Sequence, residues 1–293
     1  MKTLVGLAAA FERVTPTALK YGLARMFGAL AFRLSPRIRR HTTANMSVVL
    51  DLPLEHPRAR RLARQSVMAY AEHVVEFLRT YRMSVRELLD VTTRIEGYEH
   101  FKAMHDLNRG GIMISAHFGN WEWCGGLVSL DHPIYAVAET FPSRAVTHLL
   151  GHMRARQNVQ SIQLGGAARQ ILRVLRRGDY VALLADRPTP GDGVRVQFFG
   201  RPVWVPAGAA ALAVRAGSPL LVGGVIRNPD HTYSAYGMPP ILVDGDRPRA
   251  EAIREAMQRV MLDLETLIRK APEQWYMFRR MWADESREGE AAA

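Results

Sequence analysis

The sequence is poor in cysteine and lysine and has no long uninterrupted apolar run. Cys124 is the one cysteine among 293 residues. This excludes an intramolecular disulfide framework and any zinc or iron–sulfur site built from several cysteines, so we expect no metal centre. A reducing compartment is the natural environment for such a chain.

The N-terminal segment lacks the roughly 20 consecutive apolar residues that a membrane-spanning helix needs. Its apolar stretches are interrupted by Glu12, Arg13, Lys20, Arg25 and Arg33. A cleaved signal peptide is disfavoured, because the alanines that would form its cleavage site come too early. What remains is a pair of helices, split near Pro16, with apolar faces and basic edges. This pattern suits a helix on an anionic lipid surface, or equally a helix packed on the core with its charges in water.

The scarcity of lysine leaves arginine to carry nearly all of the positive charge. Lys+Arg 39 against Asp+Glu 28 gives a net charge of +11, which predicts an anionic partner. Arginine presents a planar fork that suits phosphate. The sequence carries no nucleic-acid-binding module, so an anionic membrane surface explains the charge better than nucleic acid.

Beyond about residue 110, short apolar runs alternate with helical patterns, without internal repeats or a long linker. We predict strands at 111–116, 133–139, 180–186 and 219–227, helices at 57–80, 143–157, 166–177, 206–216 and 249–270, and two extended pieces turning at Gly200–Arg201. Strands separated by helices indicate an α/β fold with a mostly parallel central sheet sandwiched by helices. We therefore predict amphipathic helices at the membrane surface over 1–45, one α/β domain over 46–282 and a disordered tail over 283–293.

The most informative string is GIMISAHFGNWEWCGG, residues 111–126. A strand ends at Ala116, His117 follows at once, Gly119–Asn120 suit a turn and helix N-cap, and Glu122 falls in the first helical turn. On a regular helix His117 and Glu122 would be about 140° apart. They can meet only if His117 lies in the strand-to-helix turn, where open α/β sheets place their ligand sites.

A histidine oriented by a carboxylate there would be a general base. A hydrogen-bonded structural histidine explains this pair, taken alone, about as well. A metal site lacks a third ligand at suitable spacing, and Cys124 is a packing residue in this interpretation rather than a nucleophile.

The motif Ala116-His117-Phe118-Gly119-Asn120-Trp121-Glu122 resembles one found in bacterial glycolipid acyltransferases. These are the lipid A biosynthesis (lauroyl/myristoyl) and phosphatidylinositol mannoside acyltransferases. The resemblance continues through AVAET, LRRGDYVALLADRP, GVRVQFFGRPVWVPAGAAALAVRAGSPL and PEQWYMFRRMW, and so covers most of residues 40–282. The later strings are most similar to the mannoside branch. Glu122, where many mannoside-branch members have Asp, is closer to the lipid A branch, which leaves the acceptor open.

The resemblance implies a glycerol-3-phosphate-acyltransferase-like fold and transfer of a fatty acyl group to a glycolipid hydroxyl. The donor would be acyl-CoA or acyl carrier protein, with no other cofactor and no covalent acyl-enzyme. His117 would be the base, Glu122 would hold it, and backbone N–H groups of the following turn would bind the oxyanion. The protein would be peripheral on the cytoplasmic face of the inner membrane.

Further residues are candidates for substrate contacts. The substrate-binding candidates, for which solvated or ion-paired structural roles are the alternatives, are Glu139, Arg154, Arg156, Asp186 and Arg187. For the acyl chain they are Phe198, Phe199 and Trp204, for which a plain core role is the alternative.

Two other functions fit the same residues. A thioesterase or other hydrolase would use His117 to activate water. The absence of a G-x-S-x-G motif counts against a serine lipase but not against such an enzyme. A non-catalytic protein that binds anionic lipid would need only the basic surface.

Overall fold

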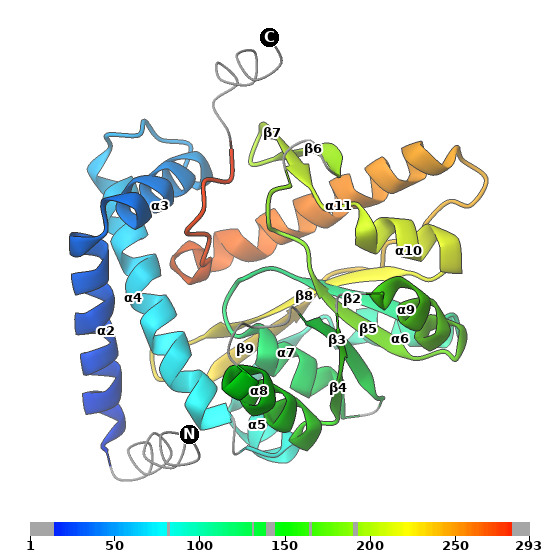
Figure 1. The fold of residues 1–293 in the computed structure, drawn as a ribbon, viewed down its shortest axis with the longest axis horizontal. Coiled ribbons are helices and arrows are strands. Elements are labelled where there is room, and N and C mark those ends of the chain that lie inside the picture. The colour runs from blue at the N-terminus through cyan, green and yellow to red at the C-terminus, as the bar shows by residue number, and fades with distance from the viewer. Residues whose placement is uncertain are drawn as a thin grey trace.

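A computed structural model describes residues 15–80, 83–130, 132–138, 144–163, 166–189 and 193–282. Its centre is a sheet made of β1 (Thr92–Glu96), β2 (Gly111–Ser115), β3 (Ile134–Ala138), β4 (Val159–Gln163), β5 (Tyr180–Leu184), β8 (Leu220–Arg227) and β9 (Tyr233–Gly237). The strand order is β1-β9-β8-β2-β5-β3-β4 (Figure 1). All neighbouring pairs are parallel except β8 and β9, which confirms the mostly parallel sheet.

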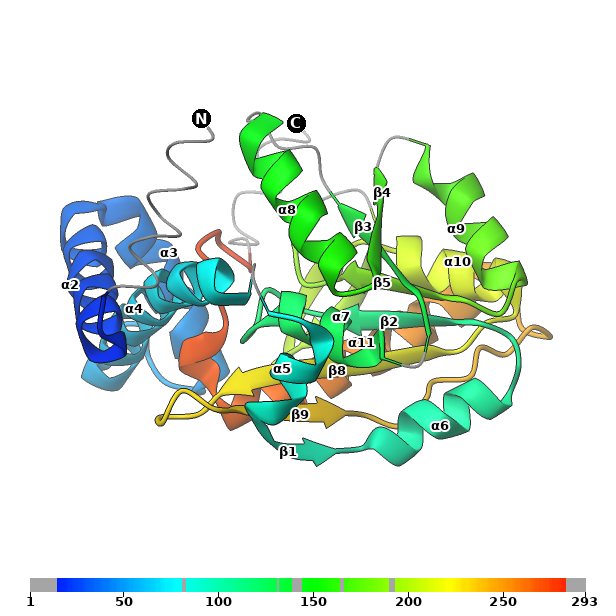
Figure 2. The same ribbon diagram turned by 90° about the horizontal axis from the view of Figure 1, so that it is seen from below.

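Helices cover both faces of this sheet (Figures 1 and 2). One face carries α9 (Ala167–Arg176), α10 (Gly208–Ala216) and α11 (Arg249–Lys270), and the other carries α5 (Val85–Asp90), α6 (Tyr98–Asp106), α7 (Trp121–Val128) and α8 (Arg144–Arg156). Because both faces are covered, a central strand such as β8 is a nearly continuous run of buried residues. The four predicted strands and the predicted helices of this region are present.

The N-terminal helices α2 (Thr17–Leu34) and α3 (Pro36–Val49) pack against α4 (Pro57–Thr80). The Ser35 side chain accepts a hydrogen bond from the amide of Ile38, and Pro36 occupies the first turn, so α3 starts where α2 ends. Helices α2 and α4 approach closely at Gly28, where a Cβ would lie 2.7 Å from the Cα of Met68. Residues 1–14 and the predicted tail, 283–293, lie outside the described residues.

Among the helices that the structure describes, none combines the length and the hydropathy needed to cross a bilayer. The apolar residues of α2 instead divide between two faces. Tyr21, Ala24 and Phe32 are buried, whereas Phe27 and Leu34 are exposed. The packing of α2 on the protein is therefore established, and an apolar stripe faces away from it.

The extended pieces form a hairpin of β6 (Val194–Phe198) and β7 (Arg201–Val205). Its turn is Phe199–Gly200, one residue earlier than predicted. Both residues have positive φ, 50° and 72°, as a two-residue hairpin turn that follows strand twist requires.

Candidate functional site

His117 and Asp186 meet at the carboxyl ends of two neighbouring strands. β2 and β5 are parallel and pair Ser115 with Leu184, and the amide of Ala185 extends the ladder to Ser115 O at 3.0 Å. His117 and Asp186 each stand two residues beyond that last pair. As a result Asp186 Oδ1 lies 2.7 Å from His117 Nδ1, and Asp186 Oδ2 accepts the His117 amide at 2.9 Å.

The Asp186 carboxylate is completely buried, and both of its oxygens take part in hydrogen bonds. Its Oδ2 also accepts the Trp275 indole N–H at 3.0 Å. Burial alone would raise the pKa of Asp186, but the charge of His117 and the hydrogen bonds from His117 and Trp275 outweigh it and hold the pKa below its usual value. An ionised Asp186 fixes the His117 tautomer with the proton on Nδ1, which makes Nε2 the proton acceptor.

His117 faces a groove of about 590 Å³. Its side chain is 18% exposed, and its ring lies 5.6 Å from the Trp121 ring. The groove is lined by residues of α4, α7, α8 and residues 271–282, here called the C-terminal segment, among them His73, Trp121, Glu122, Arg154, Arg187 and Tyr276. A histidine with a bonded Nδ1 and an accessible Nε2 is the arrangement of a general base.

Glu122 does not hold His117 as we predicted from sequence. Its carboxylate binds Arg154 of α8 in a fork, with Nε to Oε2 at 2.9 Å and NH2 to Oε1 at 2.5 Å. The physical reason is position: Glu122 stands in the first turn of α7, beside α8, whereas strand pairing delivers Asp186 to His117. The Glu122–Arg154 pair instead forms one wall of the same groove.

Two of the backbone N–H groups that were predicted to bind the oxyanion donate hydrogen bonds within the protein. The amide of Gly119 donates to Gln274 O at 2.9 Å and that of Asn120 to Val225 O at 2.8 Å. Both bonds tie the turn after His117 to the C-terminal segment and to β8. These two N–H groups are therefore structural. Arg187, which also lines the groove, stays a candidate donor.

The remaining three substrate-binding candidates differ in their positions relative to the groove. Asp186 is buried, so it acts on His117 instead of on substrate. Arg156 lies at the exposed end of α8, and it is not among the lining residues of the groove. Glu139 lies outside the described residues.

The three aromatic residues predicted for the acyl chain do not line the groove. Phe198 is 0% exposed and Phe199 8%, and both rings pack against Trp275 and Trp282. Trp204 lies in the same hairpin, in β7. Hairpin residues pack toward α11, where Glu265 accepts the Phe199 amide. The alternative of plain core applies to Phe198 and Phe199.

A small apolar cavity of about 90 Å³ opens beside the groove, under α7. The two spaces share Trp121, Glu122, Arg154 and three apolar residues, Val137, Leu183 and Leu184. Cys124 lines this cavity, and burial raises the pKa of its thiol to about 12. Such a thiol is no nucleophile at neutral pH.

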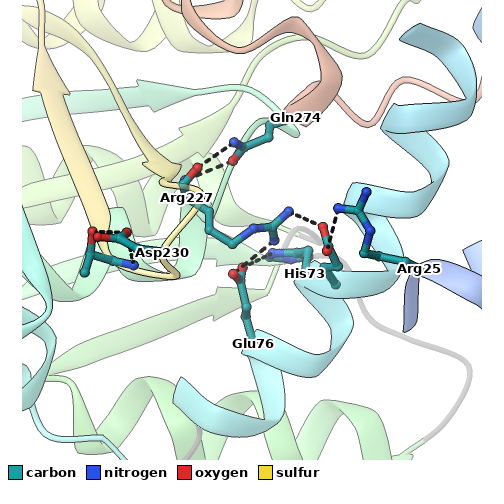
Figure 3. A network of polar contacts seen from close by, with 8 residues as sticks. Arg25, His73, Glu76, Arg227, Asp230 and Gln274 are labelled. Carbon is teal, nitrogen blue, oxygen red and sulfur yellow. Dashed lines mark hydrogen bonds and ion pairs between the residues drawn. The ribbon is translucent and has the colours of Figure 1, made fainter. Parts of the chain in front are cut away.

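Sequence reasoning missed a buried polar network between α4 and β8 (Figure 3). Arg227 of β8 binds Glu72 at 2.6 Å and Glu76 at 3.0 Å, both from α4, and Arg25 of α2 reaches Glu72 at 3.3 Å. The Gln274 side chain bonds both backbone groups of Arg227. The network therefore joins α2, α4, β8 and the segment that carries Trp275.

His73, also missed, lies between this network and the groove. It is 4% exposed, and its ring is 4.3 Å from that of Trp121. Burial, with the charges of Arg227 and His117, lowers the pKa of His73 to about 3. It is therefore a neutral neighbour of the base. Within the described residues no group of three or more His, Cys, Asp or Glu is placed to hold a metal ion.

The sequence of this chain is similar to those of known proteins. The sequence model of a family described as bacterial lipid A biosynthesis acyltransferase matches residues 4–284. A phosphatidylinositol mannoside acyltransferase of Mycobacterium tuberculosis (strain CDC 1551 / Oshkosh) is 30% identical over 162 residues, 53% of this chain and 51% of that protein. The protein of the same name from Mycolicibacterium smegmatis is 31% identical over 167 residues, 54% of each chain. The chain spans about half the length of these curated relatives.

Proposed function

Because the chain belongs to the bacterial lipid A biosynthesis acyltransferase family, we propose that it is a glycolipid O-acyltransferase. It transfers a long-chain fatty acyl group from acyl-CoA or acyl carrier protein to a hydroxyl of a membrane glycolipid. The observation that carries the proposal is the His117–Asp186 pair at the floor of a groove bordered by apolar and arginine side chains. The similarity to phosphatidylinositol mannoside acyltransferases supports an acceptor of that type, or one related to lipid A.

The reaction follows from the state of His117. Its Nε2 removes the proton of the acceptor hydroxyl as the oxygen attacks the thioester carbonyl carbon. Asp186, ionised and bonded to Nδ1, stabilises the imidazolium that forms. The carbon–sulfur bond then breaks, and the leaving thiolate takes the proton back from Nε2. No covalent acyl-enzyme forms, and the raised pKa of Cys124 supports this.

The groove wall supplies the contacts for substrate. Arg187 faces the site from the residue after Asp186, where a guanidinium can bind a phosphate or the carbonyl oxygen. The Glu122–Arg154 fork fixes the position of α7 against α8 beside the acceptor. The apolar cavity beside Trp121 receives the first part of the donor's acyl chain.

The protein acts as a peripheral protein on the anionic cytoplasmic surface of the membrane. The apolar stripe on α2 and the net charge of +11 support this location. The acceptor hydroxyl then meets His117 without leaving the membrane surface.

The decisive experiment gives purified protein palmitoyl-CoA with and without a glycolipid acceptor, and measures thiol release and acylated lipid. Acceptor-dependent release is expected. Thiol release that does not depend on the acceptor would favour a hydrolase that activates water at His117. No thiol release would favour a lipid-binding protein.

The matched variants are His117→Ala and His56→Ala, since His56 is exposed at the start of α4. We expect His117→Ala to lose transfer by at least about a hundredfold while binding vesicles normally, and His56→Ala to behave as wild type. Normal turnover of His117→Ala would refute the assigned base.

A further inference from the structure

Trp275 contacts the His117–Asp186 pair from a buried position. Its side chain is 0% exposed, and it is not among the residues that line the groove. Its indole N–H donates to Asp186 Oδ2 at 3.0 Å, while Asp186 Oδ1 faces His117 Nδ1. Trp275 therefore acts on the base only through Asp186 and is not placed to touch a substrate in the groove.

The backbone of Trp275 is bonded to the turn that carries His117. Trp275 pairs with Phe118 in an antiparallel bridge, and the amide of Tyr276 donates to His117 O at 2.8 Å. From α4, the Ser66 hydroxyl donates to Trp275 O at 2.7 Å. These bonds fix the backbone that carries the indole relative to the base.

Aromatic packing fixes the orientation of the indole ring. Three rings surround it at centroid distances of 5.8, 6.3 and 6.2 Å, those of Phe198, Phe199 and Trp282. Buried side chains that are packed on several sides keep one rotamer. The N–H of Trp275 is thus directed at Asp186 before any substrate binds.

Trp282 is a second buried indole of the same cluster, and it differs in one respect. It is 8% exposed, and its ring packs against those of Phe198 and Trp275. Its N–H has no hydrogen-bond partner among the described residues. The two indoles therefore share their packing, but only that of Trp275 is bonded to Asp186.

We propose that Trp275 is a positioning residue for the acyl transfer, whose indole N–H holds the Asp186 carboxylate in the orientation that keeps His117 a base. The inference rests on the proposed function and deepens it. Asp186 Oδ2 accepts two N–H groups, from the His117 amide and from Trp275, which leaves Oδ1 for the imidazole. Without the indole donor, the carboxylate is held less firmly and its charge is less stabilised.

The surroundings of the pair leave its own titration visible at acid pH. Among the described residues, the charge that acts on Asp186 is that of His117. Burial, with the charges of Arg227 and His117, lowers the pKa of His73 to about 3, and burial raises the pKa of Tyr276. The other charged or titratable residues that line the groove are Tyr70, Glu122, Arg154, Arg187 and Arg279, of which Glu122 is bound by Arg154.

The test compares Trp275→Phe with the matched control Trp282→Phe, which removes the same atoms from the neighbouring ring. Since a hydrogen bond to a charged group contributes about tenfold or more, kcat of Trp275→Phe should fall by at least about tenfold. Its KM for palmitoyl-CoA should stay within about twofold, because Trp275 does not line the groove. Trp282→Phe should keep the wild-type kcat.

The pH profile separates a positioning role from a merely structural one. The indole N–H stabilises the ionised pair relative to the protonated pair, so its loss favours protonation whichever residue takes the proton. The acid limb of kcat/KM should therefore move to higher pH by about one unit in Trp275→Phe and stay in place in Trp282→Phe. A lower kcat with an unmoved acid limb, or the same shift in both variants, would overturn the proposal.

A tryptophan analogue removes the N–H while the shape of the ring is kept. Benzothienylalanine, in which sulfur replaces the indole N–H, is placed at position 275 of the full chain and, as a control, at position 282. The lower kcat and the shifted acid limb are expected at position 275 alone, even if Trp275→Phe does not fold. A wild-type profile with the analogue at position 275 would refute the role of the N–H.

A failure of the proposed reaction is distinguishable from a failure of this inference. If wild type transfers no acyl group, the titration of His117 is followed by nuclear magnetic resonance of protein labelled in its histidine rings, with His117→Ala identifying the signal. A midpoint raised by about one pH unit in Trp275→Phe alone supports the positioning role without the reaction. Equal midpoints in wild type and both variants reject it.

Discussion

His117 draws its orientation from a neighbouring strand and not from the helix that follows it. Asp186 holds both the ring and the backbone amide of His117, and Trp275 holds Asp186. Two carboxylates near His117 therefore have different roles, one buried behind the histidine and one in the wall of the groove. Asp186 acts on the base, and Glu122 acts on Arg154.

Substitutions of the two carboxylates should therefore have different effects. Asp186→Asn should lower kcat by about a hundredfold or more, because the amide no longer stabilises protonated His117. For the same reason the acid limb of the pH–rate profile should move to lower pH. Glu122→Gln should keep the wild-type acid limb and act chiefly on KM. Steady-state kinetics across pH, with circular dichroism to verify folding, measure both, and an acid limb displaced by Glu122→Gln alone would reverse the assignment.

The local features of the site could be predicted from the sequence, whereas its contacts between distant segments could not. His117 stands directly after an apolar run and before a capped helix, so its place at the sheet edge could be read from sequence. Its partner could not, because the register of β2 against β5 is a non-local property. One signal was present: Ser115-Ala116-His117 and Leu184-Ala185-Asp186 end their strands with the same spacing.

At the scale of the elements, helix α2 exposes a stripe of apolar side chains. Five apolar residues of this helix are between 47% and 69% exposed, and their spacing places them on one side of the helix. They are Leu19, Met26, Phe27, Leu30 and Leu34. An apolar stripe of this kind beside basic residues suits a lipid interface.

We expect Phe27→Asp to weaken binding to anionic vesicles by at least about tenfold, since one buried aromatic ring contributes roughly 1.5–3 kcal/mol. Sedimentation with vesicles measures this. Turnover of a soluble acyl-CoA should not change, because Phe27 lies outside the groove. The control is Leu242→Asp, 66% exposed elsewhere, and equal loss in both variants would contradict a specific role of α2.

Prediction of the other elements succeeded where burial is continuous. β8 is buried along almost its whole length, and its apolar run identifies it. β1 and β4 lie at the two edges of the sheet, and most of their residues are not buried, so no apolar run marks them. They become strands because neighbouring strands offer hydrogen bonds, which is tertiary information.

At the scale of the whole molecule, the Arg227 network joins the N-terminal helices to the sheet (Figure 3). The Arg227 side chain is 8% exposed and forms ion pairs with Glu72 and Glu76, which are 6% and 1% exposed. Removing a buried partner leaves uncompensated charge, which costs more than the pair contributes.

Arg227→Met should therefore lower the free energy of unfolding by about 3–5 kcal/mol at neutral pH. Burial already raises the pKa of Glu76, and loss of Arg227 raises it further. A raised carboxyl pKa in the folded state favours the folded state at low pH, and this contribution is lost as pH rises. The penalty should accordingly shrink between about pH 7 and about pH 5. Denaturant unfolding measures it, with the exposed ion-pair residue Arg247 as control; equal effects of Arg247→Met and Arg227→Met would contradict the network's role.

The attachment of His117 and Asp186 to paired strands has a consequence for heat inactivation. Each residue stands two positions beyond its strand, so the spacing of the two hydrogen-bonded central strands, roughly 4.8 Å, limits how far the pair can separate. Central strands open only when the whole domain opens. The geometry of the base should thus survive warming until cooperative unfolding, so that activity and structure disappear at the same temperature.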